Sequence, residues 1–355
     1  MFLASFLLLN CSTPKIDRDP NTIQAPFDGK KFDNIEPFPD KSFFTLLKWR
    51  WQALFNSISW PDKIENEQFT PAQARSKSLK VYVINHATVL IQIDNLNILT
   101  DPHFTKRASP VSWAGPKRVI KPGIALKDLP PIDVVLVSHN HYDHLDLGSL
   151  QQLAQLHNPL FYVGLGTKHF LIANGVVGKS ASSTHTHSTK SESDNSAPNI
   201  IELDWWQEVS LSDIKFTFVP AQHWSARGLS DRREMLWGGF YIRGSQTIYF
   251  AGDTGYGSFF NLIREKMGSP NLAILPIGAY EPRWFMKNAH VNPEEAVKGF
   301  IDLKAKKAMA IHFGTFKLTD EGIDDPTKDL GIALKKYQLT ENDFIVPVFG
   351  KEYAL

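Results

Sequence analysis

In the first part of the chain the hydrophobic residues form mainly short runs typical of strands. In the second part, runs typical of strands alternate with patterns typical of helices. Runs rich in Val, Ile and Phe predict strands over 80–84, 88–93, 97–99, 133–137, 160–163, 215–219, 240–243, 247–250 and 272–275. Apolar residues at helical spacing predict helices over 43–55, 147–156, 259–266 and 293–303. The run DVVLV over 133–137 is typical of a strand buried on both faces. This order favours a sheet-rich α/β sandwich.

The helix predicted over 43–55 (FFTLLKWRWQALF) is rich in aromatic residues. Trp49, Trp51 and Phe55 can dock on the main domain or touch lipid. Docking is the favoured interpretation, because aromatic stripes are usually buried in protein cores. The residues 40–79 around this helix are predicted to form an N-terminal extension of the main domain at 80–350.

Two other segments contain too few apolar residues for us to expect them to form part of a hydrophobic core. Residues 12–39 are rich in Pro, Asp, Asn and Lys and are predicted to be a linker. Residues 179–199 are rich in Ser and Thr and predict a disordered insertion. The insertion contains His185 and His187 at metal-ligand spacing, but no buried framework would hold the two imidazoles.

The first eleven residues combine an apolar run with the single cysteine of the chain. MFLASFLLLN is far shorter than the roughly 20 residues needed to cross a bilayer. The sequence around Cys11 (LLNCS) resembles the lipobox of bacterial lipoproteins. That resemblance implies an exported, membrane-associated protein whose lipidated Cys11 is the anchor. A cytoplasmic protein is the alternative.

Composition limits the chemistry. The chain has 38 Lys and Arg against 37 Asp and Glu, a net charge of +1, so its overall charge does not favour nucleic acid as a partner. One cysteine excludes an internal disulfide and a zinc site built on several thiolates. With 12 histidines, a metal site must consist of imidazoles and carboxylates.

The strongest chemical signal is SHNHYDHLD over 138–146, directly after the predicted buried strand. Alternate residues of an extended segment point the same way, so His139 and His141 can face one metal ion. Asp143 and His144, past the bend, can face a second ion. Imidazole and carboxylate ligands suit zinc and other borderline divalent ions.

This H-x-H-x-D-H pattern resembles the metallo-β-lactamase superfamily, which implies an αββα sandwich of two mixed sheets with flanking helices. The superfamily also implies ligands farther along the chain, each after a strand-like run: His223, Asp253 and His312. The resemblance then implies two divalent ions. His139, His141 and His223 would hold one, and Asp143, His144 and His312 the other, with Asp253 bridging them. Zinc is favoured, while manganese or iron suit the same ligands.

Longer segments resemble the N-acylphosphatidylethanolamine-hydrolysing phospholipases D. They include NHATVL at 85–90, LTDP at 99–102, GPKR at 115–118, the run 222–238, GAYEPRWFMK at 278–287 and HVNPEEAV at 290–297. In that family, Tyr142 and His290 match positions that contact the phospholipid. The absence of a G-x-S-x-G elbow agrees with chemistry that needs no serine nucleophile.

The resemblance implies a binuclear phosphodiesterase acting on membrane phospholipid. A hydroxide held by the metals would attack phosphorus, with Asp143 and Asp253 orienting it, and would release an N-acylethanolamine and phosphatidic acid. His290 would take part in catalysis as well as substrate binding. A lactonase or other ester hydrolase is the main alternative, followed by a ribonuclease and a non-catalytic lipid-binding protein. A homodimer is left open.

Overall fold

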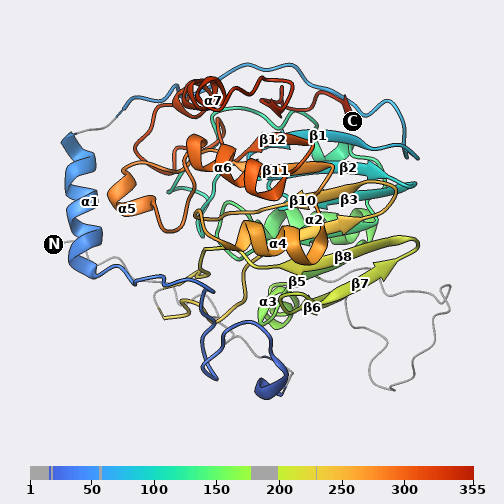
Figure 1. Ribbon diagram of the computed structural model, residues 1–355, viewed down its shortest axis with the longest axis horizontal. Coiled ribbons are helices and arrows are strands. Elements are labelled where there is room, and N and C mark those ends of the chain that lie inside the picture. Colours follow the sequence, from blue (N-terminus) through green and yellow to red (C-terminus); the bar gives the residue numbers. More distant parts are fainter. Residues whose placement is uncertain (1–15, 17–18, 56–57, 177–198, 229) are drawn as a thin grey trace.

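The computed structural model describes residues 16, 19–55, 58–176, 199–228 and 230–355. The predictions for Cys11 and for the segment 179–198 fall outside these residues. Figure 1 shows two sheets stacked face to face with helices on both outer sides. This is the predicted αββα sandwich.

Each sheet has seven strands. The first has the order β14-β1-β2-β3-β4-β5-β6 and the second β13-β12-β11-β10-β9-β8-β7. The first comprises β1 (Lys80–Asn85), β2 (Thr88–Ile93), β3 (Leu96–Thr100), β4 (Val134–Val137), β5 (Leu160–Gly164), β6 (Ile200–Leu203) and β14 (Tyr353–Ala354). The second comprises β7 (Glu208–Leu211), β8 (Ile214–Val219), β9 (Gly239–Arg243), β10 (Thr247–Phe250), β11 (Leu272–Pro276), β12 (Lys307–Ile311) and β13 (Phe344–Ile345).

Most of the described α-helices cover the outer faces of the two sheets. The α-helices are α1 (Phe43–Phe55), α2 (Leu147–His157), α3 (Thr167–Ala173), α4 (Phe259–Met267), α5 (Arg283–Met286), α6 (Pro293–Leu303) and α7 (Asp325–Lys336). Two short 3-10 helices, Pro20–Thr22 and Leu126–Asp128, complete the described elements. Apolar residues of α2 and α3 pack on the first sheet, and those of α4, α6 and α7 pack on the second. None of the described helices is long and apolar enough to cross a membrane.

Strand β4 shows how the sandwich is held together. Val134 and Leu136 contribute to the core between the sheets, while Val135 and Val137 pack under the helices on the outside. All four side chains are buried, as its continuous apolar sequence predicts. The strand therefore ends at a fixed point deep in the molecule, and the SHNHYDHLD segment begins there.

The N-terminal region differs from expectation. The described part of the segment predicted to be a linker packs against the domain: Phe32 is fully buried, and Ala25 belongs to the core between the sheets. The side-chain amide of Asn34 donates from Nδ2 to the carbonyl of His223 at 2.8 Å, and its Oδ1 accepts from the His223 backbone N–H at 2.9 Å. Its composition is typical of loops, but its few apolar side chains are inserted into the domain.

Helix α1 is only partly docked, which limits the prediction that its aromatic residues are buried. Trp49 stacks on Phe285 of α5 and donates a hydrogen bond from Nε1 to Asp320 at 2.9 Å. Trp51, in contrast, is 66% exposed. Figure 1 shows α1 standing at one side of the molecule, next to α5.

Candidate metal centre

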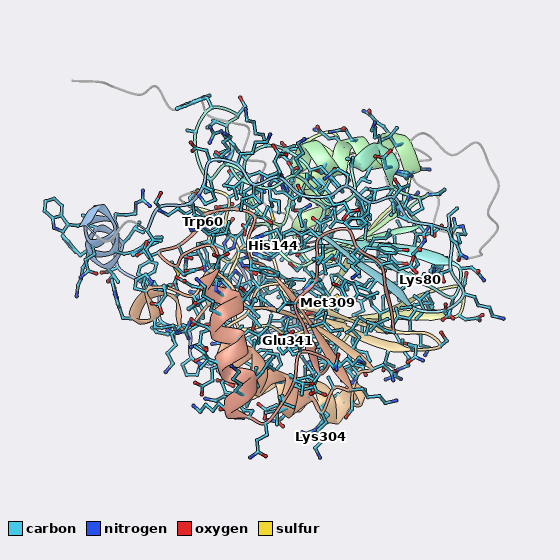
Figure 2. The ribbon with its side chains drawn as sticks, turned by 90° about the horizontal axis from the view of Figure 1, so that it is seen from above. Trp60, Lys80, His144, Lys304, Met309 and Glu341 are labelled. Carbon is cyan, nitrogen blue, oxygen red and sulfur yellow. The ribbon has the colours of Figure 1, made fainter. Side chains whose placement is uncertain are left out.

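The candidate site lies where six strands end at one edge of the sandwich. In the first sheet β1, β3 and β4 run in the same direction, and in the second β8, β10 and β12 do. The polar residues that follow these strands are His86, Asp101, the segment 138–144, His223, Asp253 and His312. In Figure 2, His144 lies inside the molecule, seen from above.

One group consists of three histidines from both sheets. Nδ1 of His141 lies 2.9 Å from Nε2 of His139 and 3.1 Å from Nε2 of His223. The His223 ring is oriented by Nδ1, which donates to the carbonyl of Ala289 at 2.9 Å and leaves Nε2 as the lone-pair nitrogen. Three ring nitrogens therefore converge, as expected for ligands of one ion.

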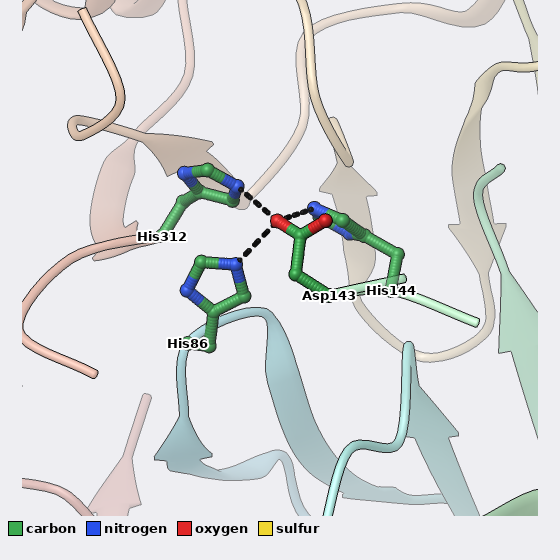
Figure 3. A group of neighbouring side chains, drawn as sticks. All are labelled: His86, Asp143, His144 and His312. Carbon is green, nitrogen blue, oxygen red and sulfur yellow. Dashed lines mark hydrogen bonds and ion pairs between the residues drawn. The ribbon is translucent and has the colours of Figure 1, made fainter. Parts of the chain in front are cut away.

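A second group surrounds Asp143. Its Oδ2 lies 3.2 Å from Nε2 of His312 and 3.3 Å from Nε2 of His144. Nε2 of His86 lies closer, at 2.9 Å, and these contacts are drawn in Figure 3. The side chains of all three histidines are at most 2% exposed.

Asp253 lies between the two groups. Its Oδ1 is 3.1 Å from Nε2 of His312, and its Oδ2 is 3.3 Å from Nε2 of His144. On the other side, Oδ2 is 3.9 Å from Nε2 of His223 and 4.0 Å from Nε2 of His139. A single buried carboxylate thus approaches members of both groups.

The glycine before Asp253 is required by close packing. Gly252 has φ +61°, and a Cβ there would lie 2.6 Å from Cβ of Ser138. Any other residue would collide with the start of the SHNHYDHLD segment. His86, Asp101 and His312 also have positive φ values, a conformation that side chains other than glycine adopt rarely and that is concentrated at functional sites.

Asp101 holds His144 and the start of the SHNHYDHLD segment in place. Its Oδ2 accepts hydrogen bonds from Nδ1 of His144 at 2.7 Å and from Oγ of Ser138 at 2.6 Å. Its Oδ1 accepts from the backbone N–H of Ser138 at 2.7 Å. The contact to Nδ1 leaves Nε2 of His144 as the nitrogen that faces Asp143 and Asp253. A carboxylate behind a ligand histidine is the usual support of a protein metal site.

His290 and Tyr142, predicted to contact substrate, are placed differently. Nδ1 of His290 lies 3.7 Å from Oδ2 of Asp253, and the side chain is 16% exposed, so it borders the charged site. The hydroxyl of Tyr142 donates to the carbonyl of Arg227 at 2.8 Å, and the Arg227 guanidinium lies 4.0 Å from the Tyr142 ring centre. Tyr142 and Arg227 line a cavity of about 340 Å³, whose lining does not include His290.

Burial and charge set the protonation of the site. Burial lowers the pKa of His141 to about 3 and that of His223 to about 4, which keeps both imidazoles neutral and able to act as ligands. For His312 burial also opposes the charged form, but Asp253 and Asp143 outweigh it and raise the pKa to about 9. Burial favours the neutral form of Asp143 and Asp253, but the neighbouring His144, followed by His312, outweighs it and holds the pKa values of both carboxyl groups well below the usual range.

These residues fit divalent metal ions. The described residues contain four clusters whose ligand atoms lie within 4.8 Å of one another: His86/Asp143/His144/His312, His139/His141/His223, His139/His144/Asp253 and His223/Asp253/His290. Nitrogen ligands at about 2.0–2.1 Å from a tetrahedral zinc would lie roughly 3.3 Å apart, close to the spacing observed around His141. Among the described side chains, Nε2 of His144 and Oδ1 of Asp253 are buried without a hydrogen bond, as expected of ligand atoms.

All seven residues predicted as ligands therefore come together in one place. His86 and Asp101 complete the site, but they were not predicted as site residues. Both belong to segments singled out by resemblance, NHATVL and LTDP, and both directly follow a strand. A histidine or aspartate at the end of a strand, on the same edge as the ligand motif, is the signal that could have identified them.

The comparisons with known proteins agree with this geometry. Residues 96–313 match the family model of the beta-lactamase superfamily domain. The chain is 40% identical over 238 residues to N-acyl-phosphatidylethanolamine-hydrolyzing phospholipase D 1 of Caenorhabditis elegans, covering 66% of this chain and 64% of that protein. It is 35% identical over 245 residues to the mitochondrial N-acyl-phosphatidylethanolamine-hydrolyzing phospholipase D of Saccharomyces cerevisiae, covering 67% of this chain and 48% of that protein. The matched region thus spans less than two thirds of each of these two relatives.

A solved structure shares the fold. Isothiocyanate hydrolase from Delia radicum gut bacteria has a TM-score of 0.58 and 19% sequence identity, covering 78% of this chain and 99% of that one. At this identity the likeness concerns the fold alone. The family model matches more than half of the chain, and the histidine and aspartate clusters agree with it, so this chain belongs to the beta-lactamase superfamily.

Proposed function

We propose that the protein hydrolyses the phosphodiester bond of N-acylphosphatidylethanolamine-type phospholipids, releasing an N-acylethanolamine and phosphatidic acid. The observation that carries this proposal is the position of Asp253, with oxygens facing both the His139/His141/His223 group and the Asp143/His144/His312 group. Two adjacent cation sites that share a carboxylate suit phosphodiester hydrolysis. The substrate class is supported by the 40% identity to the nematode phospholipase D.

We assign one ion to His139, His141 and His223, a second to Asp143, His144 and His312, and a bridging position to Asp253. Zinc is the favoured metal because imidazole and carboxylate are among its usual ligands in proteins, and manganese or iron suit the same set. When bound, the ions supply an acidified water as nucleophile at neutral pH and stabilise negative charge on the phosphate.

The protein's own residues fix this arrangement. Asp101 holds the His144 ring through Nδ1, and His86 holds the Asp143 carboxylate through Nε2. Both contacts are made by buried side chains, so the ligands are oriented before substrate arrives. We propose that Asp143 and Asp253, which are anionic acceptors here, orient the attacking water.

Substrate contacts are assigned to His290 and Tyr142. His290 borders Asp253 and is partly exposed, so its imidazole can donate a hydrogen bond to a phosphate oxygen placed there. The hydroxyl of Tyr142 donates to the carbonyl of Arg227, so we assign Tyr142 a contact with the substrate through its ring. This contact would lie in the cavity that Tyr142 lines with Arg227 and Lys106. Arg227, Lys106 and Arg107, which all line this cavity, suit a phosphate-bearing substrate.

The test is a panel of substrates given to the purified protein with its metal content measured. The panel contains N-acylphosphatidylethanolamine, phosphatidylethanolamine, a lactone and structured RNA, with Asp253→Asn as the matched inactive control. We expect turnover of the N-acylated phospholipid to exceed that of every other member. Preferential lactone hydrolysis would favour the ester-hydrolase alternative, and normal lipid binding without turnover by the metal-loaded protein would indicate a binding protein.

A further inference from the structure

Helix α1 presents an exposed apolar face. Phe44, Leu47 and Trp51 are 79, 46 and 66% exposed, and they recur at i, i+3 and i+7, so they lie on one side of the helix. With Lys48 and Arg50 they line a shallow hollow on the surface. A contiguous apolar face of this kind on a soluble domain usually marks an interaction surface.

The opposite face of α1 attaches the helix to the domain. Thr45, Trp49 and Gln52 are half-buried, and Trp49 is held by Phe285 and Asp320. Farther along the chain, Nε1 of Trp60 donates to the carbonyl of Glu321 at 2.9 Å. The helix is thus fixed at one edge of the molecule, as Figures 1 and 2 both show. Helical spacing places Phe44, Leu47 and Trp51 on a different side of the helix from the anchored residues.

The charges around this face are positive. Helix α1 contains Lys48 and Arg50 and no acidic residue. Asp40, just before the helix, already forms ion pairs with Arg232 and Arg233 at 3.0 and 3.2 Å. Asp40 is therefore engaged by these two arginines, and Asp320 contacts the helix on its anchored side through Trp49.

Helix α1 is connected to the candidate site by contacts through α5. Trp284 of α5 is 48% exposed, with Nζ of Lys48 5.1 Å from its ring centre. Arg283 of α5 donates from Nη1 to the carbonyl of His290 at 2.9 Å, and the His290 backbone N–H bonds Met286 of α5 at 3.0 Å. Helix α5 therefore joins the apolar face of α1 to a residue that borders Asp253.

We propose that the exposed face of α1, formed by Phe44, Leu47, Lys48, Arg50 and Trp51, docks on a phospholipid bilayer that carries anionic headgroups. Large aromatic and aliphatic side chains beside Lys and Arg are the composition of helices that lie in the membrane interface. Lysine and arginine side chains near the membrane surface attract anionic lipid headgroups. A symmetric contact between two copies is less favourable, because it would bring Lys48 and Arg50 of both copies onto the same face.

This inference rests on the proposed function for its purpose, since the substrate would be taken from the same bilayer. The binding itself is tested without substrate. The full chain in a Cys11→Ser background, which excludes a lipid anchor, is sedimented with vesicles of phosphatidylcholine alone or mixed with phosphatidylglycerol. We expect binding to the mixed vesicles that weakens as salt is added.

Two sets of substitutions locate the contact. Leu47→Glu with Trp51→Glu should weaken binding to the mixed vesicles by about tenfold or more. Lys48→Gln with Arg50→Gln should weaken binding to the mixed vesicles roughly tenfold and leave binding to neutral vesicles unchanged. Ile332→Glu, at an equally exposed apolar residue on α7, is the matched control and should bind like the parent protein. Thermal unfolding confirms that each variant is folded.

Failure of this inference is distinguishable from failure of the proposed function. A parent protein that binds neither kind of vesicle, or folded α1 variants that bind like the parent, would overturn the docking surface. A dimer that becomes monomeric in the Leu47→Glu and Trp51→Glu variant, with vesicle binding unchanged, would assign the face to a second copy. Hydrolysis of N-acylphosphatidylethanolamine in detergent micelles tests the chemistry without vesicle binding. No hydrolysis in micelles, together with normal binding to vesicles, would contradict the proposed function and not the docking surface.

Discussion

Oδ2 of Asp101 accepts a hydrogen bond from Nδ1 of His144 at 2.7 Å, in a place where neither side chain is exposed to solvent. The same oxygen accepts from Oγ of Ser138. Asp101→Asn would replace one acceptor oxygen with an NH₂ group, which in either orientation of the amide would face at least one N–H donor, from His144 or from the Ser138 backbone. We expect metal affinity to fall by about 10- to 100-fold.

Chelator competition measures this affinity. Asp324→Asn, at an exposed carboxylate that only approaches Lys328, is the matched control and should leave it unchanged. An Asp101→Asn protein with parental affinity would show that the support of His144 does not contribute to metal binding.

His86 gives a second prediction. Its Nε2 lies 2.9 Å from Oδ2 of Asp143, nearer than the Nε2 atoms of His144 and His312. His86→Ala should therefore weaken metal binding at the Asp143 group and lower the metal-to-protein ratio measured by elemental analysis. The His139/His141/His223 group should keep its ion.

The variant His86→Gln separates two roles for His86. The glutamine amide can donate to Asp143 but is a poor ligand for zinc. Recovery of the metal content in His86→Gln would indicate that His86 positions Asp143. If both variants have the low ratio, His86 acts as a ligand, and if both have the parental ratio, it contributes to neither.

Loss of a central ligand should abolish activity without unfolding the protein. Asp253→Asn and His141→Ala each remove a group that faces the proposed ions, and we expect hydrolysis to fall by about 10²- to 10³-fold or more. Circular dichroism should show parental secondary structure, because the core between the sheets is untouched. Full activity in either folded, metal-analysed variant is incompatible with the proposed site.

The N-terminal segment should contribute to stability. Phe32→Ala removes a fully buried aromatic side chain and should cost about 3–5 kcal/mol of unfolding free energy. Ile35→Ala, in the same segment but 43% exposed, is the control and should cost far less. Denaturant unfolding measures both. Equal effects would mean that Phe32 does not contribute to the domain core.

The central sandwich could be predicted from sequence because its strands are apolar and regular. The start of α6 could be predicted as well: Asn292 accepts from the backbone of Glu295 at 2.8 Å, and Glu295 closes the capping box. The ligand motif was recognisable because four metal-binding side chains occur within six residues. That Asp253 and His312 join them depends on pairing between distant strands, and only the resemblance suggested it.

Other features have weak sequence signals. Helix α7 contains Gly331, a poor helix former, in its interior, and it buries Leu330 and Leu334 against the second sheet. Strand β14 is two residues long, too short to have a period, and it pairs with β1 beyond the predicted end of the domain at residue 350. Phe32 lies in a segment whose composition is typical of loops, and composition does not reveal which apolar side chain is inserted into a core.

The most direct test of the central claim is hydrolysis of N-acylphosphatidylethanolamine in ¹⁸O-labelled water, followed by mass spectrometry of the products. Attack on phosphorus breaks the bond between phosphorus and the ethanolamine oxygen. We therefore predict that phosphatidic acid carries one labelled oxygen and that the N-acylethanolamine carries none. Label in the N-acylethanolamine, or release of labelled fatty acid in place of these products, would contradict the proposed phosphodiester hydrolysis.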